Sequence, residues 1–143
     1  MLGASPTRTM QPRSKPDTRR MQRILLIDDN VDALDMLALM LEAMGHSVQR
    51  VYNPRDALAR ALEFQPELVF LDLAMPHKSG YEVLEELRAC AYTRTLRVFA
   101  LTGSSAVEER TRTAAAGFDG HLSKPVEDAR LRELLAEPNP EPG

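Results

Sequence analysis

The sequence predicts a three-layer α/β fold in which a doubly wound parallel sheet is covered by helices on both faces. Short apolar runs alternate with segments of about 10 residues whose apolar positions have helical spacing. This alternation repeats five times between residue 22 and the C-terminus. Several of the short runs are apolar at every position, as expected of strands that helices bury on both faces.

Three of the expected strands are continuously apolar and therefore belong in the interior of the sheet. They span residues 23–27, 68–71 and 98–101. The expected strand 47–52 contains Gln49 and Arg50, which suits a position at the edge. A short last strand, 120–123, directly precedes Lys124. We therefore expect a sheet of five strands.

Helices are expected between these strands and after the last one. Helix 31–44 carries its apolar residues on one stripe, which we expect to face the sheet. The stripe consists of Val31, Leu34, Leu37, Ala38, Leu41 and Met44. Asn30 can cap the start of this helix, and Gly45 can take the left-handed geometry common at a helix end. The other helices are expected at 54–64, 80–90, 106–116 and 127–136.

Composition and charge divide the chain into one domain and two tails. The net charge is −3, but residues 1–23 carry +5 and the remainder carries −8. We expect 1–21 to be a basic, disordered tail or linker, 22–137 to be the domain, and 138–143 to be a Pro-rich tail. The acidic domain argues against DNA binding, and we expect no DNA-binding or other output module in this chain. A contact of the basic tail with an acidic partner or a nucleic acid stays open.

The sequence indicates a cytoplasmic protein. No apolar run approaches the roughly 20 residues needed to span a bilayer. The basic N-terminus lacks the apolar stretch of a secretory signal. Cys90 is the one cysteine, so the chain cannot form an internal disulfide and a reducing compartment is expected.

Polar residues follow four of the expected strands at their carboxyl ends, which is where open parallel sheets bind ligands. Asp28 and Asp29 follow the first strand, Asp72 the third, Thr102 the fourth and Lys124 the fifth. Three carboxylates, one hydroxyl and one ammonium would converge there. A group of carboxylate oxygens suits a hard divalent cation such as Mg2+.

Each of these residues taken alone also has a structural explanation. Asp28 and Asp29 can cap the helix that follows them. Asp72 can belong to a turn, and Lys124 can be a solvated charge. It is the convergence of all five residues at one edge that favours a functional site.

Other polar or soft side chains offer weaker candidates. His46 and His77 lie in expected turns without the neighbours of a metal pair, and Cys90 has no nearby base. A role in the core or in a partner surface is expected for Met36, Met40 and Met44.

Over residues 22–137 the motifs resemble those of the receiver domains of two-component response regulators. The matching stretches are Ile27-Asp28-Asp29-Asn30, Leu71-Asp72-Leu73-Ala74-Met75-Pro76, Ala100-Leu101-Thr102-Gly103 and Ser123-Lys124-Pro125. The resemblance implies a flavodoxin-like sheet of the receiver type, with strand order 2-1-3-4-5 and a cis Lys124-Pro125 bond. It also implies a phosphorelay function. Asp72 would accept a phosphoryl group, in a Mg2+-dependent reaction, from the phosphohistidine of a histidine kinase or a histidine phosphotransfer protein.

The resemblance implies a role for each residue of the site. Asp72 would be the nucleophile that forms an acyl phosphate. Mg2+ would be bound by Asp29, by Asp28 through water, by Asp72 and by the backbone carbonyl of Ala74. Lys124 would pair with the phosphoryl oxygens as a compact charge.

The resemblance also implies a conformational switch. Thr102 would donate its hydroxyl to the phosphoryl group and draw the following loop toward it, which would change the affinity for an unknown downstream protein. His121 stands where the family often has an aromatic residue that completes this movement. Ala74 and Ser104 occupy the positions that tune the lifetime of the acyl phosphate. A homodimer through the last two helices and the last strand is a habit of the family.

A phosphoacceptor switch of this kind would not be a turnover enzyme, and two other functions compete with it. An aspartyl phosphatase with Asp28 as nucleophile would need an acid two residues later, where the chain has Asn30. A scaffold that works without phosphate would have no need of three converging carboxylates. The chain could be a stand-alone regulator or the terminal receiver of a hybrid histidine kinase.

Overall fold

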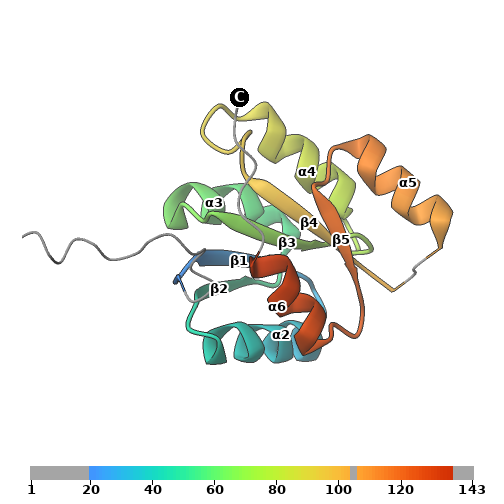
Figure 1. Ribbon diagram of the computed structural model, residues 1–143. Helices are drawn as coiled ribbons and strands as arrows, with labels where there is room; N and C mark the ends of the chain where they lie inside the picture. The colour runs from blue at the N-terminus through green and yellow to red at the C-terminus, as the bar shows by residue number, and fades with distance from the viewer. Residues whose placement is uncertain (1–19, 104–105, 137–143) are drawn as a thin grey trace, which may run out of the picture.

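In the computed structural model, five parallel strands form one sheet in the order β2-β1-β3-β4-β5 (Figure 1). The structure describes residues 20–103 and 106–136. The strands are β1 (Arg23–Ile27), β2 (Ser47–Val51), β3 (Leu68–Asp72), β4 (Arg97–Thr102) and β5 (Gly120–Ser123). The helices are α2 (Val31–Ala43), the 3-10 helix η1 (Pro54–Asp56), α3 (Ala57–Phe64), α4 (Gly80–Ala89), α5 (Val107–Ala116) and α6 (Asp128–Ala136). The predicted fold class and strand order are confirmed, and the Lys124-Pro125 bond is cis.

Helices cover both faces of the sheet. Figure 1 shows α2 and α6 on one face and α3, α4 and α5 on the other. Because side chains alternate along a strand, Ile24 and Leu26 pack with the first pair of helices, whereas Leu25 and Ile27 pack with the second group. All four side chains are fully buried. The continuously apolar pattern of β1 therefore reflects burial on both faces.

The register of the sheet aligns the ends of the strands from which the candidate site is built. Ile27 of β1 pairs with Leu71 of β3, and Asp72 pairs with Leu101 of β4. Thr102, the last residue of β4, pairs with Ser123 of β5. Since the strands are parallel, the residues that follow these pairs emerge at the same edge of the sheet.

Several local predictions need correction. Val31 does not belong to the buried stripe of α2, because it is the first helical residue, lies past the end of β1 and is 49% exposed. Helix α2 ends at Ala43, with Met44 as its C-cap. The segment expected as one helix over 54–64 begins with the 3-10 turn η1 and becomes α-helical only at Ala57.

The predicted cap is present: the Asn30 side chain accepts a hydrogen bond from the Ala33 amide.

Some predictions fall on residues outside the described ranges. Residues 1–19, 104–105 and 137–143 are outside them, and these include most of the expected basic tail, the Pro-rich tail and Ser104. Among the residues that are described, no helix has the length and apolar character needed to cross a bilayer.

His46 is buried in the turn before β2, a placement that its sequence context did not indicate. Its Nδ1 accepts a hydrogen bond from the backbone amide of Gln22 at 3.1 Å. The Gln22 carbonyl in turn accepts one from the Ser47 amide, so His46 helps to hold the start of β1 against β2. Burial lowers the pKa of His46 below its ordinary value of 6.5, and the nearby charge of Glu67 offsets part of this effect.

We predict that acid weakens the fold through His46. The unfolded chain, with the ordinary pKa, binds the proton more tightly than the folded protein does. The contribution of His46 is therefore complete above about pH 6.5 and is lost as the pH falls toward the folded-state pKa. In His46→Asn, a side-chain oxygen can accept the Gln22 hydrogen bond, worth about 1 kcal/mol, without titrating. Urea unfolding between pH 7.5 and 5 should show a shallower loss of stability in the variant, and equal slopes would contradict this role.

Candidate functional site

Three carboxylates come together at the carboxyl edge of the sheet. Asp28 and Asp29 follow β1, and Asp72 ends β3. One carboxylate oxygen of each lies within 4.8 Å of the others. Asp28 is 1% exposed and Asp72 is 5% exposed, whereas Asp29 is open to solvent. The structure thus brings together side chains that are up to 44 positions apart in the chain.

Lys124 supplies positive charge to this cluster from the end of β5. Its Nζ lies 2.9 Å from Oδ2 of Asp28 and 2.9 Å from Oδ1 of Asp72. Its backbone amide donates to the carbonyl of Thr102 at 2.7 Å, which fixes the start of its loop against β4. The pairing of one ammonium with both buried carboxylates was not foreseen from the sequence, which pointed only to a common edge.

The backbone orients Asp28 from both sides. Its amide donates to the carbonyl of Val51 at 3.1 Å, which continues the pairing of β1 with β2. Its Oδ1 accepts a hydrogen bond from the Asn30 amide at 3.0 Å. Because Asn30 also caps α2, the turn that begins this helix sets the direction of the Asp28 carboxylate.

Burial and charge oppose each other in the cluster. Burial raises the pKa of Asp72, and the neighbouring carboxylates of Asp28 and Asp29 add to this effect, while the hydrogen bond and charge of Lys124 counteract it. Burial alone would lower the pKa of Lys124, but hydrogen bonds to Asp72 and Asp28 raise it above the ordinary value. One ammonium faces three carboxylates, so the cluster keeps an excess of negative charge.

The donor set fits a hard divalent cation. All three side chains offer carboxylate oxygen, and the grouped atoms include no nitrogen or sulfur ligand among the described residues. Oxygen ligands of this kind suit Mg2+, which usually takes one or two carboxylates and retains waters. Asp29 is exposed, so solvent can reach the side of the cluster where such waters would lie.

Three further residues that the sequence singled out lie at different places relative to the cluster. Thr102 is buried at the end of β4, and Ala74 is exposed two residues after Asp72. His121 is half-buried on β5 and pairs with Ala100. Burial lowers the pKa of His121, and the charges of Arg110 and Arg130 lower it further. His121 therefore belongs to the surface between α5 and α6 and not to the oxygen cluster.

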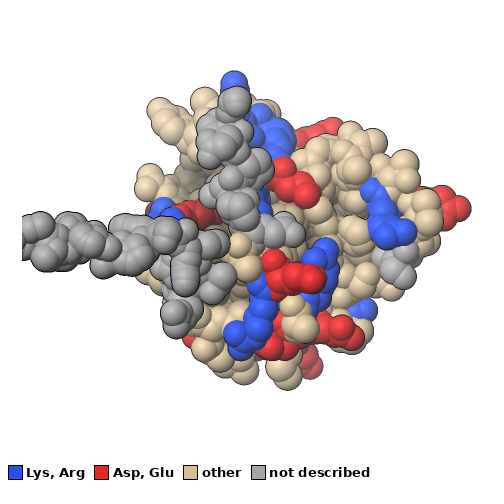
Figure 2. All heavy atoms as spheres, in the orientation of Figure 1, with Lys and Arg blue, Asp and Glu red and all other residues tan. Residues whose placement is uncertain are grey.

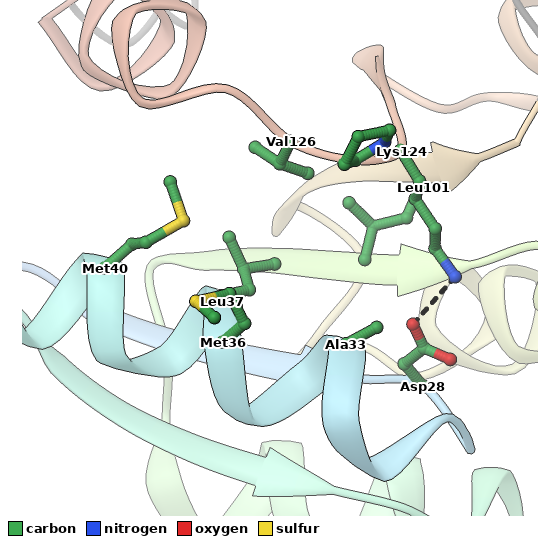
Figure 3. Close-up of a pocket in the computed structure, with 9 residues that line it drawn as sticks. Asp28, Ala33, Met36, Leu37, Met40, Leu101, Lys124 and Val126 are labelled. Carbon is green, nitrogen blue, oxygen red and sulfur yellow. Dashed lines mark ion pairs between the residues drawn. The ribbon is translucent and has the colours of Figure 1, made fainter.

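An apolar cavity of about 120 Å3 lies beside the cluster, between α2 and the loop that leads from β5 to α6. Figure 3 shows the Asp28–Lys124 ion pair at one end of this cavity and Met36 and Met40 of α2 along its side. Val126 lines it from the loop. The cavity thus offers an apolar surface next to the ion pair, against which an apolar side chain could pack.

Charges of both signs are distributed over the displayed surface. Figure 2 shows Lys and Arg interspersed with Asp and Glu on this face, without a single broad basic patch among the described residues. Two of the ion pairs on α6 join Arg130 to Glu133 and Arg132 to Asp128.

The sequence is similar to a known domain family and to several of its members. The profile of the response regulator receiver domain matches residues 24–136. The chain is 35% identical over 119 residues to the DNA-binding dual master transcriptional regulator RpaA of Synechocystis, covering 80% of this chain and 49% of RpaA. It is 31% identical over 115 residues to protein PilH of Pseudomonas aeruginosa, covering 80% of this chain and 95% of PilH. The chain therefore spans about half the length of RpaA but nearly all of PilH.

Solved structures are similar over the same region. The chemotaxis response regulator CheY4 of Vibrio cholerae matches with a TM-score of 0.75 and 26% identity, covering 81% of this chain and 97% of that one. The receiver domain of the sensor histidine kinase PA1611 of Pseudomonas aeruginosa, with a magnesium ion coordinated in its active site cleft, matches with a TM-score of 0.73 and 28% identity. That match covers 81% of this chain and 95% of the other. By sequence and by fold, this chain belongs to the family of response regulator receiver domains of two-component signalling.

Proposed function

We propose that this chain is a phosphoacceptor switch in which Asp72 receives a phosphoryl group from a phosphohistidine. The donor would be a histidine kinase or a histidine phosphotransfer protein. The observation that carries the proposal is the grouping of Asp28, Asp29 and Asp72 at the carboxyl edge of the sheet, where Lys124 pairs with Asp28 and Asp72. A buried carboxylate beside an ammonium and two further acids has the parts needed to accept an anionic phosphoryl group.

Mg2+ is the proposed cofactor. Asp28, Asp29 and Asp72 would hold it through their carboxylates, with the backbone carbonyl of Ala74 as a further ligand. When bound, the ion would offset the charge of the transferring phosphoryl oxygens. The magnesium ion in the related receiver domain of PA1611 supports this choice, as does the all-oxygen donor set.

The residues of this chain then have separate tasks in the transfer. A carboxylate oxygen of Asp72 attacks phosphorus, the phosphorus–nitrogen bond to the donor histidine breaks, and the imidazole leaves with the bonding electrons. Lys124, already 2.9 Å from Asp72, is placed to pair with the phosphoryl oxygens. Thr102, at the neighbouring strand end, is the hydroxyl proposed to bind the phosphoryl group once it is attached. In this proposal the phosphorylated form persists and changes the binding of a partner, so the protein acts as a switch and not as a turnover enzyme.

The helix that follows Thr102 is suited to move. Within α5, all of which is described, Thr113 is the one buried residue. On its α4 side, α5 is held by Tyr81, whose hydroxyl donates to Glu109 at 2.9 Å and whose ring lies under the guanidinium of Arg112. Elements with few buried contacts open at low cost in free energy. We propose that α5, with His121 beside it, is the part that changes on phosphorylation and alters binding of a downstream protein.

The lifetime of the phosphorylated state would depend on how readily water reaches the acyl phosphate. We propose that Ala74 and Ser104 control the access of water to the acyl phosphate. Ala74 is exposed and offers no polar side chain to orient a water molecule. Ser104 lies outside the described residues.

A phosphatase with Asp28 as nucleophile is less consistent with the contacts of the site. The side chain two residues later, Asn30, accepts a hydrogen bond from Ala33 as the helix cap. An amide in that role cannot serve as a general acid or base. Both carboxylate oxygens of Asp28 are also engaged, Oδ2 by Lys124 and Oδ1 by the Asn30 amide, which leaves the side chain poorly placed to attack.

The apolar cavity beside the ion pair suggests how the phosphodonor docks. The donor histidine must reach Asp72, so the chain that carries it must lie against the surface next to Lys124. Met36, Met40 and Val126 line that surface. Met36 is 61% exposed, which leaves its thioether free to pack against an apolar side chain of the donor. We therefore propose this cavity as the contact for a helix of the phosphodonor.

The first test is the site of modification. Incubation with a small phosphodonor and Mg2+ should raise the intact mass by one phosphoryl group, and Asp72→Asn should abolish the increase because an amide cannot form the acyl phosphate. Asp56→Asn, a change at the exposed acid that ends η1, is the matched control and should be modified normally. Undiminished labelling of Asp72→Asn would show that another residue is the acceptor. Rapid repeated hydrolysis of the phosphodonor without labelling of the protein would favour an enzyme.

A second prediction concerns Lys124 in the absence of metal. Lys124→Met leaves two buried carboxylates without their cation, which should lower the free energy of unfolding by about 2 kcal/mol. Mg2+ should restore more stability to this variant than to the wild type, because the ion then offsets charge that Lys124 no longer offsets. Thermal melts with and without Mg2+ measure the difference. Lys78→Met, which removes an ion pair to Glu86 away from the cluster, should show no such metal dependence.

The docking surface is tested by comparing phosphoryl transfer from a protein donor with labelling by a small phosphodonor. Met36→Glu places a charge at the mouth of the cavity and should slow transfer from a phosphorylated histidine phosphotransfer domain about tenfold, or about 1.4 kcal/mol. Labelling by the small phosphodonor should not change. Leu39→Glu is the control, since Leu39 is 57% exposed on the same helix but does not line the cavity. Equal effects of the two substitutions on protein-dependent transfer would argue against this surface.

A further inference from the structure

The first turn of α4 lies directly against the peptide that follows the proposed phosphoacceptor. A β-carbon added at Gly80 would lie 2.3 Å from the carbonyl oxygen of Asp72 and 2.9 Å from the Cα of Leu73. Both distances are far inside van der Waals contact. The neighbours are backbone atoms, so a side chain at position 80 could not be accommodated by a change of rotamer.

Hydrogen bonds hold the same peptide from two sides. The Gly80 amide donates to the carbonyl of Leu73 at 3.0 Å, and the Leu73 amide donates to the carbonyl of Leu101 on β4 at 3.2 Å. The side chains of Leu73 and Met75 are buried in the core beneath α4. The chain from Asp72 to Met75 is therefore held between β4 and α4.

Helix α4 cannot easily give way to relieve a clash. Its start is fixed by a capping box, in which Ser79 Oγ accepts from the Glu82 amide and a Glu82 carboxylate oxygen accepts from the Ser79 amide. Its inner face is anchored by Val83, Leu84 and Leu87, all of them buried. A methyl group at position 80 would therefore displace the loop, not the helix.

We propose that Gly80 is a positioning residue for the metal and phosphoryl site. Because Gly80 has no side chain, the first turn of α4 can pack directly against the backbone of Asp72 and Leu73. This contact would fix the position of Asp72 and, two residues later, of the Ala74 carbonyl. Both are proposed ligand positions, so the inference rests on the proposed function. Mg2+ demands near-octahedral geometry at about 2.0–2.1 Å, and it loses affinity when one ligand is displaced by a fraction of an ångström.

The test compares two glycines that differ in what a methyl group would meet. Gly80→Ala should weaken Mg2+ binding about tenfold in a calorimetric titration with the metal alone. In Gly120→Ala a methyl group would lie 2.9 Å from the Phe99 ring, at the end of β5 away from the carboxylates. This control should lower the thermal midpoint but leave the Mg2+ affinity unchanged. A loss that merely followed stability would appear in both variants.

The outcomes separate this inference from the proposed function. Wild-type affinity for Mg2+ in a folded Gly80→Ala variant would overturn the role of Gly80 while leaving the metal site intact. Failure of the wild type itself to bind Mg2+ would contradict both. If Gly80→Ala does not fold, the Ser79→Ala variant provides the test. It removes the hydroxyl of the capping box and so loosens the first turn of α4 without adding an atom. The affinity of that variant for Mg2+ should fall, and an unchanged affinity would overturn the inference.

Discussion

Repulsion among three carboxylates at one edge of the sheet is the constraint on which the rest of this structure depends. Two of them, Asp28 and Asp72, are buried. In the protein interior, charges repel one another more strongly than they do in water. Lys124 lies 2.9 Å from each and offsets part of the repulsion. The three carboxylates offer the oxygen ligands that suit a hard divalent cation, and Mg2+ is the cation that we propose for this cluster.

The fold holds this unfavourable arrangement in place because its strands leave little freedom to separate the charges. Apolar side chains on both faces bury β1, β3 and β4 between two layers of helices. The strand ends carry the acids. The amide of Asn30, which caps α2, donates to the Asp28 carboxylate, and the Gly80 amide of α4 donates to the Leu73 carbonyl next to Asp72. Helix α5, next to α4, is packed more loosely, since Thr113 is its one buried residue. A firmly held carboxylate cluster beside a weakly packed helix is consistent with the switch that we propose.

The sequence predicted features that depend on local pattern or on strand order. Continuous apolar runs indicated the inner strands, and Asn30 capped α2 as expected because a cap depends on its own next few residues. Features set by distant segments could not be predicted. Val31 matched the apolar stripe but lies past the end of β1, and the burial of His46 depends on Gln22 from another part of the chain.

The same distinction applies within the site. The convergence of the acids followed from their places at strand ends, and the structure brings them together. The shared pairing of Lys124 with Asp28 and Asp72 required the actual register of the loops. The contact of Gly80 with Asp72 was also hidden, although the Ser79 and Glu82 pair marks the start of α4 in the sequence. Close approach between backbones leaves no signal in a single sequence beyond the glycine itself.

A crystal structure of this chain grown with Mg2+ and fluoroberyllate, which imitates a bound phosphoryl group, tests the central claim most directly. The structure should contain one metal ion among Asp28, Asp29 and Asp72, with the fluoroberyllate on the Asp72 carboxylate and Lys124 moved to contact it. An ion bound elsewhere, or an Asp72 carboxylate still paired only with Lys124 at saturating concentrations, would contradict the assignment of this cluster as the phosphoacceptor site.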